Sequence, residues 1–390
     1  MKILHLTYSD SFGGANIAAS RLNNLLNRYN IKSNLLVIEK KTNSKSVNAY
    51  NYFFNFLIKR LRPYLEKIIL LIMGFKSNKA SLNIINSNLS EVINNSDCDI
   101  VHLHWVNNEM ISLEDITKIK KPIFWTLHDF WPINSILHYP KKVKTNILIN
   151  FILKKYEIRK KKLFKKVFFY LICPSYWIKK KITKNSYIIP KKIFVIPNPL
   201  PTNFWQFKKN NLKKKNKIRI LVGAVDIVDD ERKGIKNFIK VLSKINFREL
   251  PEIELVIFGS GNYKKIPENL NFKVKFFNYL NKFTLRTLYS SSDVFIICSE
   301  QDNLPNTASE AMLCGTPVIF SGNNGLSDII IKKKNGYFIK NFNEVDLFKA
   351  LKWSLNSKKS VVREVTINNL NESLLIKKFL KAYNFVKNEV

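Results

Sequence analysis

Cysteine is scarce in this 390-residue chain, and the few that occur stand far apart. None belongs to a Cys-x-x-Cys pair and most fall within apolar runs; the four are Cys98, Cys173, Cys298 and Cys314. This distribution argues against a disulfide framework and against a cysteine metal site. It predicts buried, reduced thiols in a cytosolic protein.

Long apolar runs are also missing. No window holds about eighteen uncharged apolar residues, so the sequence predicts no membrane-spanning helix. The first residues, 1–8, already have the pattern of a strand, and we therefore expect no secretory signal peptide.

Acidic residues are few: the chain has 29 Asp and Glu against 65 Lys and Arg, which gives a formal net charge of +36. The excess is uneven, because residues 154–192 contain fourteen basic side chains and one acid, Glu157. Such charge suits nucleic acid, an anionic membrane or an acidic substrate. Only ten of the 65 are Arg, and no nucleic-acid-binding motif occurs, so we expect no nucleic acid partner. A codon bias toward Lys, Asn and Ile is a further explanation for part of the charge.

Strand and helix patterns alternate along the chain, which predicts an α/β protein with parallel, doubly wound sheets. A proline cluster at 197–201 separates two such series and suits an interdomain linker. The first series has strands at 3–8, 34–38, 100–103, 122–126 and 168–173, and a helix at 15–28. The second has strands at 218–223, 254–258, 273–277, 294–298 and 317–320. We therefore predict two domains, residues 1–200 and 201–375.

The most informative segment is 298–320. A buried strand ends near Cys298, a polar loop follows, and a helix opens near Asn306. Asp302 thus lies beyond the carboxyl end of a strand, where open parallel sheets bind ligands, and Glu310 stands eight residues later on the helix. Carboxylates there can accept hydrogen bonds from sugar or ribose hydroxyls. The alternative is an acid that favours the helix dipole and another that is merely solvated.

Other loops at strand ends carry candidate residues. Gly13 and Gly14 would let a ligand approach the start of the first helix, although most such glycines only form turns. His128 lies in the segment 125–132 after a strand, where a structural histidine is the commoner interpretation. His102 and His104 are two apart, a spacing that suggests a metal, but no third ligand is evident in the sequence. We interpret them as structural or acceptor-side residues.

Six motifs, including two not yet described, Pro174-Ser175 and Lys233-Gly234, occur in the order typical of a known family. The other four are Gly13-Gly14, the His128 segment, Pro197-Asn198, and Asp302 with Glu310. Together the six resemble the retaining glycosyltransferases of family 4, and the segment 302–307 resembles an exopolysaccharide and O-antigen subgroup. The resemblance implies a GT-B fold, with two Rossmann-like domains facing across a cleft and a C-terminal helix, 376–390, returning to the first. It implies transfer of a hexosyl or N-acetylhexosaminyl group from a nucleotide-sugar to a growing lipid-linked glycan or oligosaccharide.

The same resemblance implies roles for single residues. Lys233 stabilises the leaving diphosphate together with Arg232, which replaces an Arg that usually stands at about 224–226. Asp302 holds sugar hydroxyls; Glu300 is the alternative, but it is ten residues from Glu310 rather than eight. Glu310 holds the ribose and His128 the sugar near the reacting carbon. The remaining donor-binding residues are Gly13, Gly14, Gly234, Gly259, Asn303 and Leu304. We expect no cofactor and no metal, since no Asp-x-Asp motif of the metal-dependent GT-A kind occurs.

Two segments depart from the strand and helix series. Residues 52–75 are aromatic-rich and basic, and residues 151–169 predict a helix with lysines opposite an apolar face formed by Leu153, Tyr156, Leu163, Phe164 and Val167. Both are either ordinary core-facing helices or an interface with the inner face of the plasma membrane. Two other functions compete with the transferase: a non-catalytic basic membrane- or nucleic-acid-binding protein on a GT-B scaffold, and a GT-B sugar-nucleotide epimerase. The epimerase would need acids in the first domain that we cannot place.

Overall fold

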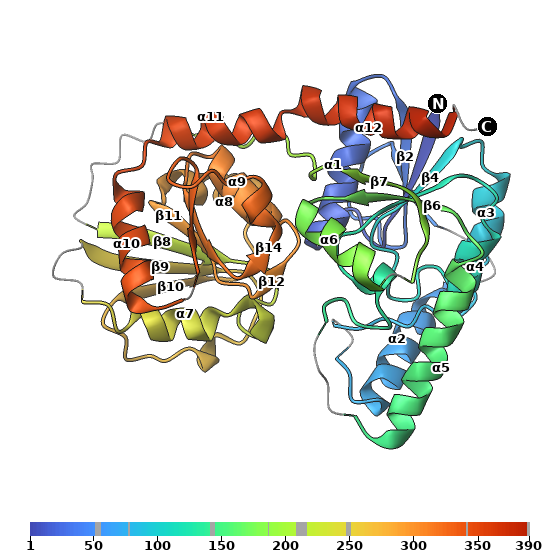
Figure 1. Cartoon of the computed structure of the whole chain (residues 1–390), viewed down its shortest axis with the longest axis horizontal. Coiled ribbons are helices and arrows are strands. Elements are labelled where there is room, and N and C mark those ends of the chain that lie inside the picture. Colours follow the sequence, from blue (N-terminus) through green and yellow to red (C-terminus); the bar gives the residue numbers. More distant parts are fainter. Residues whose placement is uncertain are drawn as a thin grey trace. The chain divides into compact units, whose positions relative to one another are not determined.

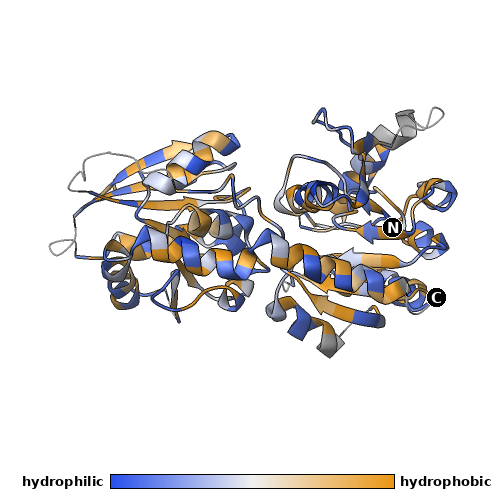
Figure 2. Cartoon of the chain, turned by 90° about the horizontal axis from the view of Figure 1, so that it is seen from above, coloured by the Kyte–Doolittle hydropathy of each residue, from blue (hydrophilic) through white to orange (hydrophobic). Residues whose placement is uncertain are grey.

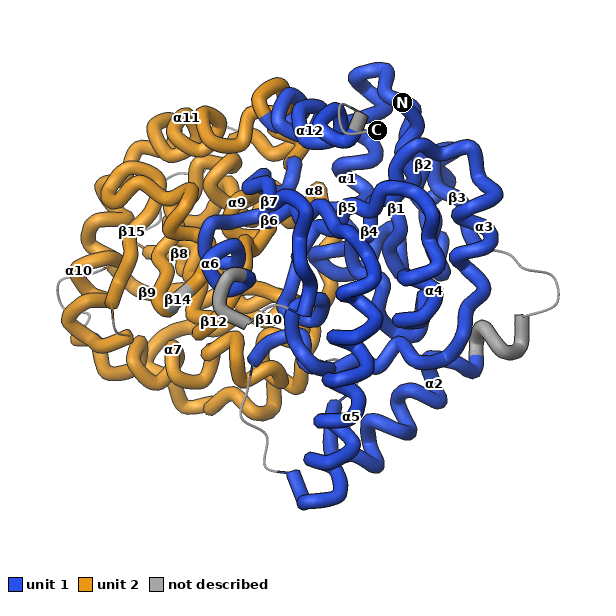
Figure 3. Tube along the Cα trace, turned by 45° about the vertical axis from the view of Figure 1, so that its right-hand side comes forward, with its two compact units in different colours: residues 1–199, 375–390 blue, residues 200–374 orange. Residues whose placement is uncertain are grey.

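The computed structural model describes residues 1–50, 56–76, 79–140, 145–185, 187–207, 217–246, 251–340 and 342–387. The chain divides into two compact units (Figure 3). The first comprises Met1–Pro199 and Leu375–Val390, and the second comprises Leu200–Leu374. Within the described ranges, no helix has the length and apolar character needed to cross a membrane.

The first unit is built on a parallel seven-stranded sheet of order β3-β2-β1-β4-β5-β6-β7 (Figure 1). The five strands predicted here are present, each within a few residues of its expected bounds. Two further strands, β3 and β7, occupy the two edges of the sheet. The bounds are β1 (Lys2–Leu6), β2 (Lys32–Val37), β3 (Val47–Ala49), β4 (Ile100–Leu103), β5 (Ile123–Thr126), β6 (Phe169–Cys173) and β7 (Pro190–Val195).

Helices cover this sheet, and the last of them comes from the far end of the chain. Helix α12 (Glu372–Lys387) buries Leu375, Phe379 and Tyr383 against α1 and the sheet. It therefore completes the core of the first unit. The other helices are α1 (Gly14–Arg28), α2 (Phe56–Ile72), α3 (Leu89–Asn95), α4 (Leu113–Lys118), η2 (Trp131–Ile133), α5 (Ile147–Phe164) and α6 (Tyr176–Asn185).

The second unit has a parallel six-stranded sheet of order β10-β9-β8-β11-β13-β15. Its five predicted strands are present, and β15 adds an edge strand. In Figure 2 the strands of both sheets are largely orange, as expected for strands that are covered on both faces. The strands are β8 (Lys217–Gly223), β9 (Glu252–Phe258), β10 (Lys273–Phe277), β11 (Val294–Ile297), β13 (Val318–Ser321) and β15 (Gly336–Ile339). The helices are α7 (Ile235–Leu242), α8 (Lys282–Ser291), α9 (Asn306–Leu313), α10 (Glu344–Leu355) and α11 (Lys359–Leu370).

One expectation for α5 is wrong. Lys160 does not lie on a solvated lysine face, because its side chain is fully buried. Its ammonium donates hydrogen bonds to the carbonyl oxygens of Trp131, at 2.6 Å, and Ser135, at 2.8 Å, and lies 3.7 Å from the centre of the Trp131 ring. Burial lowers the pKa of Lys160 well below its usual value. The residue therefore ties α5 to the loop that follows β5. The four cysteines, in contrast, are buried and free, as predicted.

Candidate functional site

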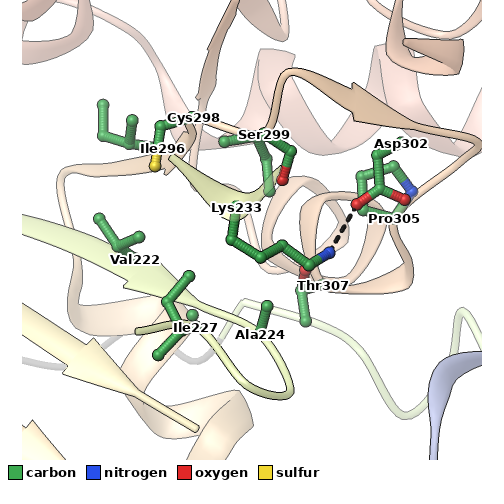
Figure 4. Close-up of a pocket in the computed structure, with 12 residues that line it drawn as sticks. Val222, Ala224, Ile227, Lys233, Ile296, Cys298, Ser299, Asp302, Pro305 and Thr307 are labelled. Carbon is green, nitrogen blue, oxygen red and sulfur yellow. Dashed lines mark hydrogen bonds and ion pairs between the residues drawn. The ribbon is translucent and has the colours of Figure 1, made fainter. Parts of the chain in front are cut away.

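A pocket lies at the carboxyl ends of β8 and β11 in the second unit (Figure 4). These two neighbouring strands are the point where the strand order reverses, which is the usual ligand crevice of an open parallel sheet. Lys233 and Asp302 both line the pocket, as do Ala224, Ser299 and Thr307. The loops after the two strands thus place two predicted site residues in one cavity.

A glycine sets the position of Lys233. The short helix η3 (Glu231–Lys233) ends at Gly234, which has a φ of 69° and begins α7. A Cβ atom at Gly234 would lie 2.2 Å from the carbonyl oxygen of Cys298, at the end of β11. Only glycine permits both this backbone conformation and this close approach. Gly234 therefore acts on the site by allowing the Lys233 turn to pack against the end of β11.

Two cations meet the Asp302 carboxylate. Lys233 Nζ lies 2.7 Å from Asp302 Oδ2, and Arg232 Nη1 lies 3.5 Å from the same oxygen. Arg232 is itself held by the Gln301 carbonyl oxygen, at 2.6 Å, and by Asp230, at 3.0 Å. Burial alone would raise the pKa of Asp302, but Lys233 and then Arg232 outweigh it, so the pKa lies below its usual value. Asp302 is therefore ionised at neutral pH.

Glu300 and Asp302, the two alternatives for the first acid, differ in their surroundings in this pocket. The Glu300 side chain is exposed, and its backbone N–H donates to the Arg232 carbonyl oxygen at 2.9 Å. Asp302, and not Glu300, lies beside Lys233. A feature that the sequence did not reveal supports this loop: β12 (Gln301–Asp302) pairs with β14 (Asn323–Asn324), so the loop after β13 lies next to Asp302.

The other predicted residues of this loop and helix are buried. Asn303 and Leu304 follow Asp302 with 2% and 7% of their surface exposed. Glu310, on α9, is 5% exposed and accepts a hydrogen bond from the Tyr289 hydroxyl at 3.3 Å. Glu310 is thus an inward-facing acid and not a solvated one, and it does not line the pocket that holds Lys233.

Gly259 lies at the end of β9, one strand away from the pocket. Its φ is 122°, and a Cβ atom there would lie 1.9 Å from the Ala224 carbonyl oxygen. Its N–H donates to the Phe277 and Asn278 carbonyl oxygens, at 2.9 and 3.0 Å. Gly259 therefore brings the loops after β8 and β9 together, while its own amide is used within the protein.

The remaining predicted residues belong to the first unit. Gly13, with a φ of 85°, precedes Gly14 at the start of α1, just beyond the end of β1. His128 follows β5 and is half-buried, and burial lowers its pKa to about 4. Strands β1 and β5 both neighbour β4, so these loops leave the same edge of the first sheet.

A third histidine, which the sequence alone does not reveal, lies beside His102 and His104. His5 on β1 is in register with His102 on β4, and ring nitrogens of the three residues lie within 4.8 Å of one another. Hydrogen bonds already engage five of their six ring nitrogens, with each other, His128, Thr126 and Tyr383. Only the parallel pairing of β1 with β4 reveals this cluster, because nearly a hundred residues separate its members in the sequence.

Comparison with known proteins assigns the family. Residues 58–204 match the profile of the family described as Glycosyltransferase Family 4, and residues 203–369 match that of Glycosyl transferases group 1. The chain belongs to family 4 of the glycosyltransferases. Solved glycosyltransferases share the fold of this family 4 member over nearly its whole length, and the fold is GT-B.

Two of these structures illustrate the likeness of fold. HepE of Anabaena, in complex with UDP and glucose, has a TM-score of 0.69 and 14% identity, covering 98% of this chain and 99% of HepE. The lipopolysaccharide outer core galactosyltransferase WaaB has a TM-score of 0.62 and 18% identity, covering 99% of this chain and all of WaaB.

Curated relatives match shorter stretches of this chain. An uncharacterised glycosyltransferase of Methanocaldococcus jannaschii is 34% identical over 165 residues, 38% of this chain and 41% of the relative. The alpha-monoglucosyldiacylglycerol synthase of Streptococcus pneumoniae is 24% identical over 236 residues, 56% of this chain and 50% of the relative. The chain spans about half or less of the length of the curated relatives it matches.

Proposed function

We propose that this family 4 protein is a retaining glycosyltransferase. It would move a hexosyl or N-acetylhexosaminyl group from a nucleotide-sugar to a growing, lipid-linked bacterial surface glycan. The observation that carries the proposal is the pair of cations, Lys233 and Arg232, fixed around Asp302 at the pocket of the second unit. Its GT-B neighbours support it, because HepE was solved with UDP-glucose and WaaB and WaaG belong to lipopolysaccharide synthesis.

The proposed chemistry is displacement on one face of the donor sugar. Breaking the anomeric C–O bond leaves negative charge on the departing diphosphate, and fixed cations stabilise that charge. Lys233 and Arg232 would supply this stabilisation without a metal. The diphosphate itself would help to deprotonate the acceptor hydroxyl. Once Lys233 turns to the diphosphate, Asp302 would accept hydrogen bonds from the sugar hydroxyls. Glu310 would bind the ribose and His128 the sugar.

The proposal of a lipid-linked acceptor is supported by helix α2 of the first unit, whose apolar side chains face solvent. On α2 the polar side chains Arg62 and Glu66 face the protein and are 4% and 2% exposed, while an apolar stripe faces solvent. The stripe follows helical spacing, and its members are 48% to 76% exposed: Leu61, Tyr64, Leu65, Ile68, Leu71 and Ile72. Solvent-facing apolar stripes of this kind mark interaction sites or the surface of a membrane-bound helix.

Helix α5 lies beside α2 and adds the charge (Figures 1 and 3). Its first turns expose Ile147, Leu148 and Phe151, which are 90%, 66% and 55% exposed. Lysines on and just after this helix are also exposed, namely Lys154, Lys155, Lys162, Lys165 and Lys166. Apolar insertion together with attraction of about 1 kcal/mol per lysine suits an anionic lipid surface. We propose peripheral binding to the cytoplasmic leaflet through α2 and α5.

A thermal-stability screen tests the donor. The purified protein is heated with UDP-, GDP- and dTDP-sugars, and a ligand at 100 times its dissociation constant should stabilise it by about 2.7 kcal/mol. We expect one nucleotide class to raise the melting temperature in wild type and much less in Lys233→Ala. No shift with any nucleotide, or equal shifts in both proteins, would contradict the proposed donor site.

A further inference from the structure

Three histidine rings form an unbroken hydrogen-bonded chain inside the first unit, and His128 is its end. His5 Nδ1 lies 3.0 Å from His104 Nε2, and His104 Nδ1 lies 3.1 Å from His128 Nε2. The residues come from the carboxyl ends of β1, β4 and β5. His5 and His104 are 0% and 4% exposed, so solvent does not compete for their contacts.

A fourth histidine holds this chain in place. The His102 ring stacks on that of His104, with centres 4.2 Å apart and planes at 27°. His102 is itself fixed from both sides, at 2.7 Å from the Tyr383 hydroxyl on α12 and 2.7 Å from the Thr126 hydroxyl on β5. The His104 ring therefore has little freedom to turn away from His128.

The His5–His104 and His104–His128 hydrogen bonds allow only two placements of the hydrogen atoms on the three rings. Burial lowers the pKa of His5 to about 3 and that of His128 to about 4, and it also lowers the pKa of His104 well below its usual value. Each ring is thus neutral at neutral pH and carries one N–H. If His104 carries it on Nδ1, it donates to His128 Nε2 and accepts from His5 Nδ1. All three rings then carry hydrogen on Nδ1; in the other placement all three carry it on Nε2.

The inner end of the chain decides between the two. His5 Nε2 is buried and makes no hydrogen bond with any residue in the described ranges. Buried N–H groups without an acceptor are rarer than acceptors that lack a donor. An unprotonated Nε2 on His5 is therefore favoured, and it places the hydrogen of His128 on Nδ1.

We propose that His104 is a positioning residue which, backed by His5, holds His128 in the neutral tautomer with hydrogen on Nδ1. This rests on the proposed function, because it defines what His128 offers to the sugar. In this state His128 Nε2 accepts from His104 and Nδ1 carries a hydrogen, so toward the sugar His128 can act as a hydrogen-bond donor but not as a base. A metal ion on His5, His102 and His104 is the competing use of the cluster, but it would have to displace the contacts that join the rings.

Two substitutions of similar size test the two hydrogen bonds of His104 separately. The amide of Asn reaches the place of Nδ1, so His104→Asn keeps the hydrogen bond to His128 and loses the one with His5. The amide of Gln reaches the place of Nε2, so His104→Gln keeps the hydrogen bond with His5 and loses the one to His128. A hydrogen bond is worth about 1 kcal/mol, so we expect turnover to fall roughly 5-fold in His104→Gln and to stay within about 2-fold of wild type in His104→Asn. Equal losses in both variants would mean a purely structural role and would overturn the proposal.

Nitrogen NMR of histidine-labelled protein tests the hydrogen placement independently of activity. The chain has five histidines, so each can be assigned. We expect the Nδ1–H tautomer for His128 in wild type and in His104→Asn, and a change in His104→Gln. An Nε2–H tautomer of His128 in wild type would overturn the proposal even if neither variant folded. One equivalent of tightly bound metal in the purified protein would do the same.

The two readouts also separate this inference from the function on which it rests. An inactive wild-type protein with the expected tautomer would contradict the transferase and leave the histidine array supported. An active protein with the other tautomer would do the reverse.

Discussion

Replacing Lys233 with alanine is the sharpest perturbation of the donor site. The ammonium is one of two cations within 4.0 Å of Asp302, and its side chain is only 14% exposed, so little solvent screens it. Removal of one preorganised group that stabilises developing charge lowers turnover by roughly 10²- to 10³-fold, about 2.7–4 kcal/mol. Arg232 remains 3.5 Å from Asp302, so the carboxylate keeps a counter-charge and we expect the variant to fold.

The assay is release of nucleoside diphosphate at saturating donor, which isolates turnover from donor binding. Lys240→Ala is the matched control, because this lysine is exposed on the neighbouring helix α7. We expect the control to retain wild-type turnover. Near-wild-type turnover of Lys233→Ala, or an equal loss in Lys240→Ala, would refute the assignment of Lys233 to the leaving group.

Three further predictions concern the acids and the membrane surface. Asp302→Asn should lower kcat, while Glu310→Gln should mainly raise the KM for the donor; the reverse pattern, or a silent Asp302→Asn beside a harmful Glu300→Gln, would contradict the roles given to them. Burial raises the pKa of Glu66 to about 7 from 4.5, so its ionisation destabilises the fold as pH rises between these values. Glu66→Gln should therefore raise the free energy of unfolding by roughly 3 kcal/mol more at about pH 8 than at about pH 4, and Glu91→Gln, an exposed acid on α3, should show no such difference. Changing four surface lysines of the first unit to Gln should weaken binding to anionic vesicles, whereas changing four of the second unit should not; equal binding by both variants would leave codon bias as the explanation of the charge. The two sets are Lys161, Lys162, Lys165 and Lys166, and Lys334, Lys340, Lys349 and Lys352.

Much of the fold was predictable because buried parallel strands leave a local signal. Val294–Ile297 and Val318–Ser321 are short apolar runs bounded by turns, and both are central strands whose residues are buried. The strands that were missed lie at sheet edges. Val47–Ala49 has three residues, and Pro190–Val195 exposes two lysines, so neither has the apolar continuity of a central strand.

The placement of Lys233 and Asp302 in one pocket was predictable, because each belongs to a motif that follows the end of a strand. The partners of a side chain were not predictable where residues distant in the sequence supply them. Lys160 belongs to a lysine run and gives no local sign that backbone carbonyl groups on another element bury it. His5 likewise acquires its partners from β4 only through the register of the sheet.

The configuration of the transferred sugar tests retaining transfer most directly. Proton NMR can follow the wild-type protein with its donor and record the anomeric signal of the first sugar released, to water or to an acceptor, before it mutarotates. Retaining transfer predicts the same anomeric configuration as in the donor, together with one nucleoside diphosphate per sugar. The opposite configuration, or no consumption of any UDP-, GDP- or dTDP-sugar, would contradict it.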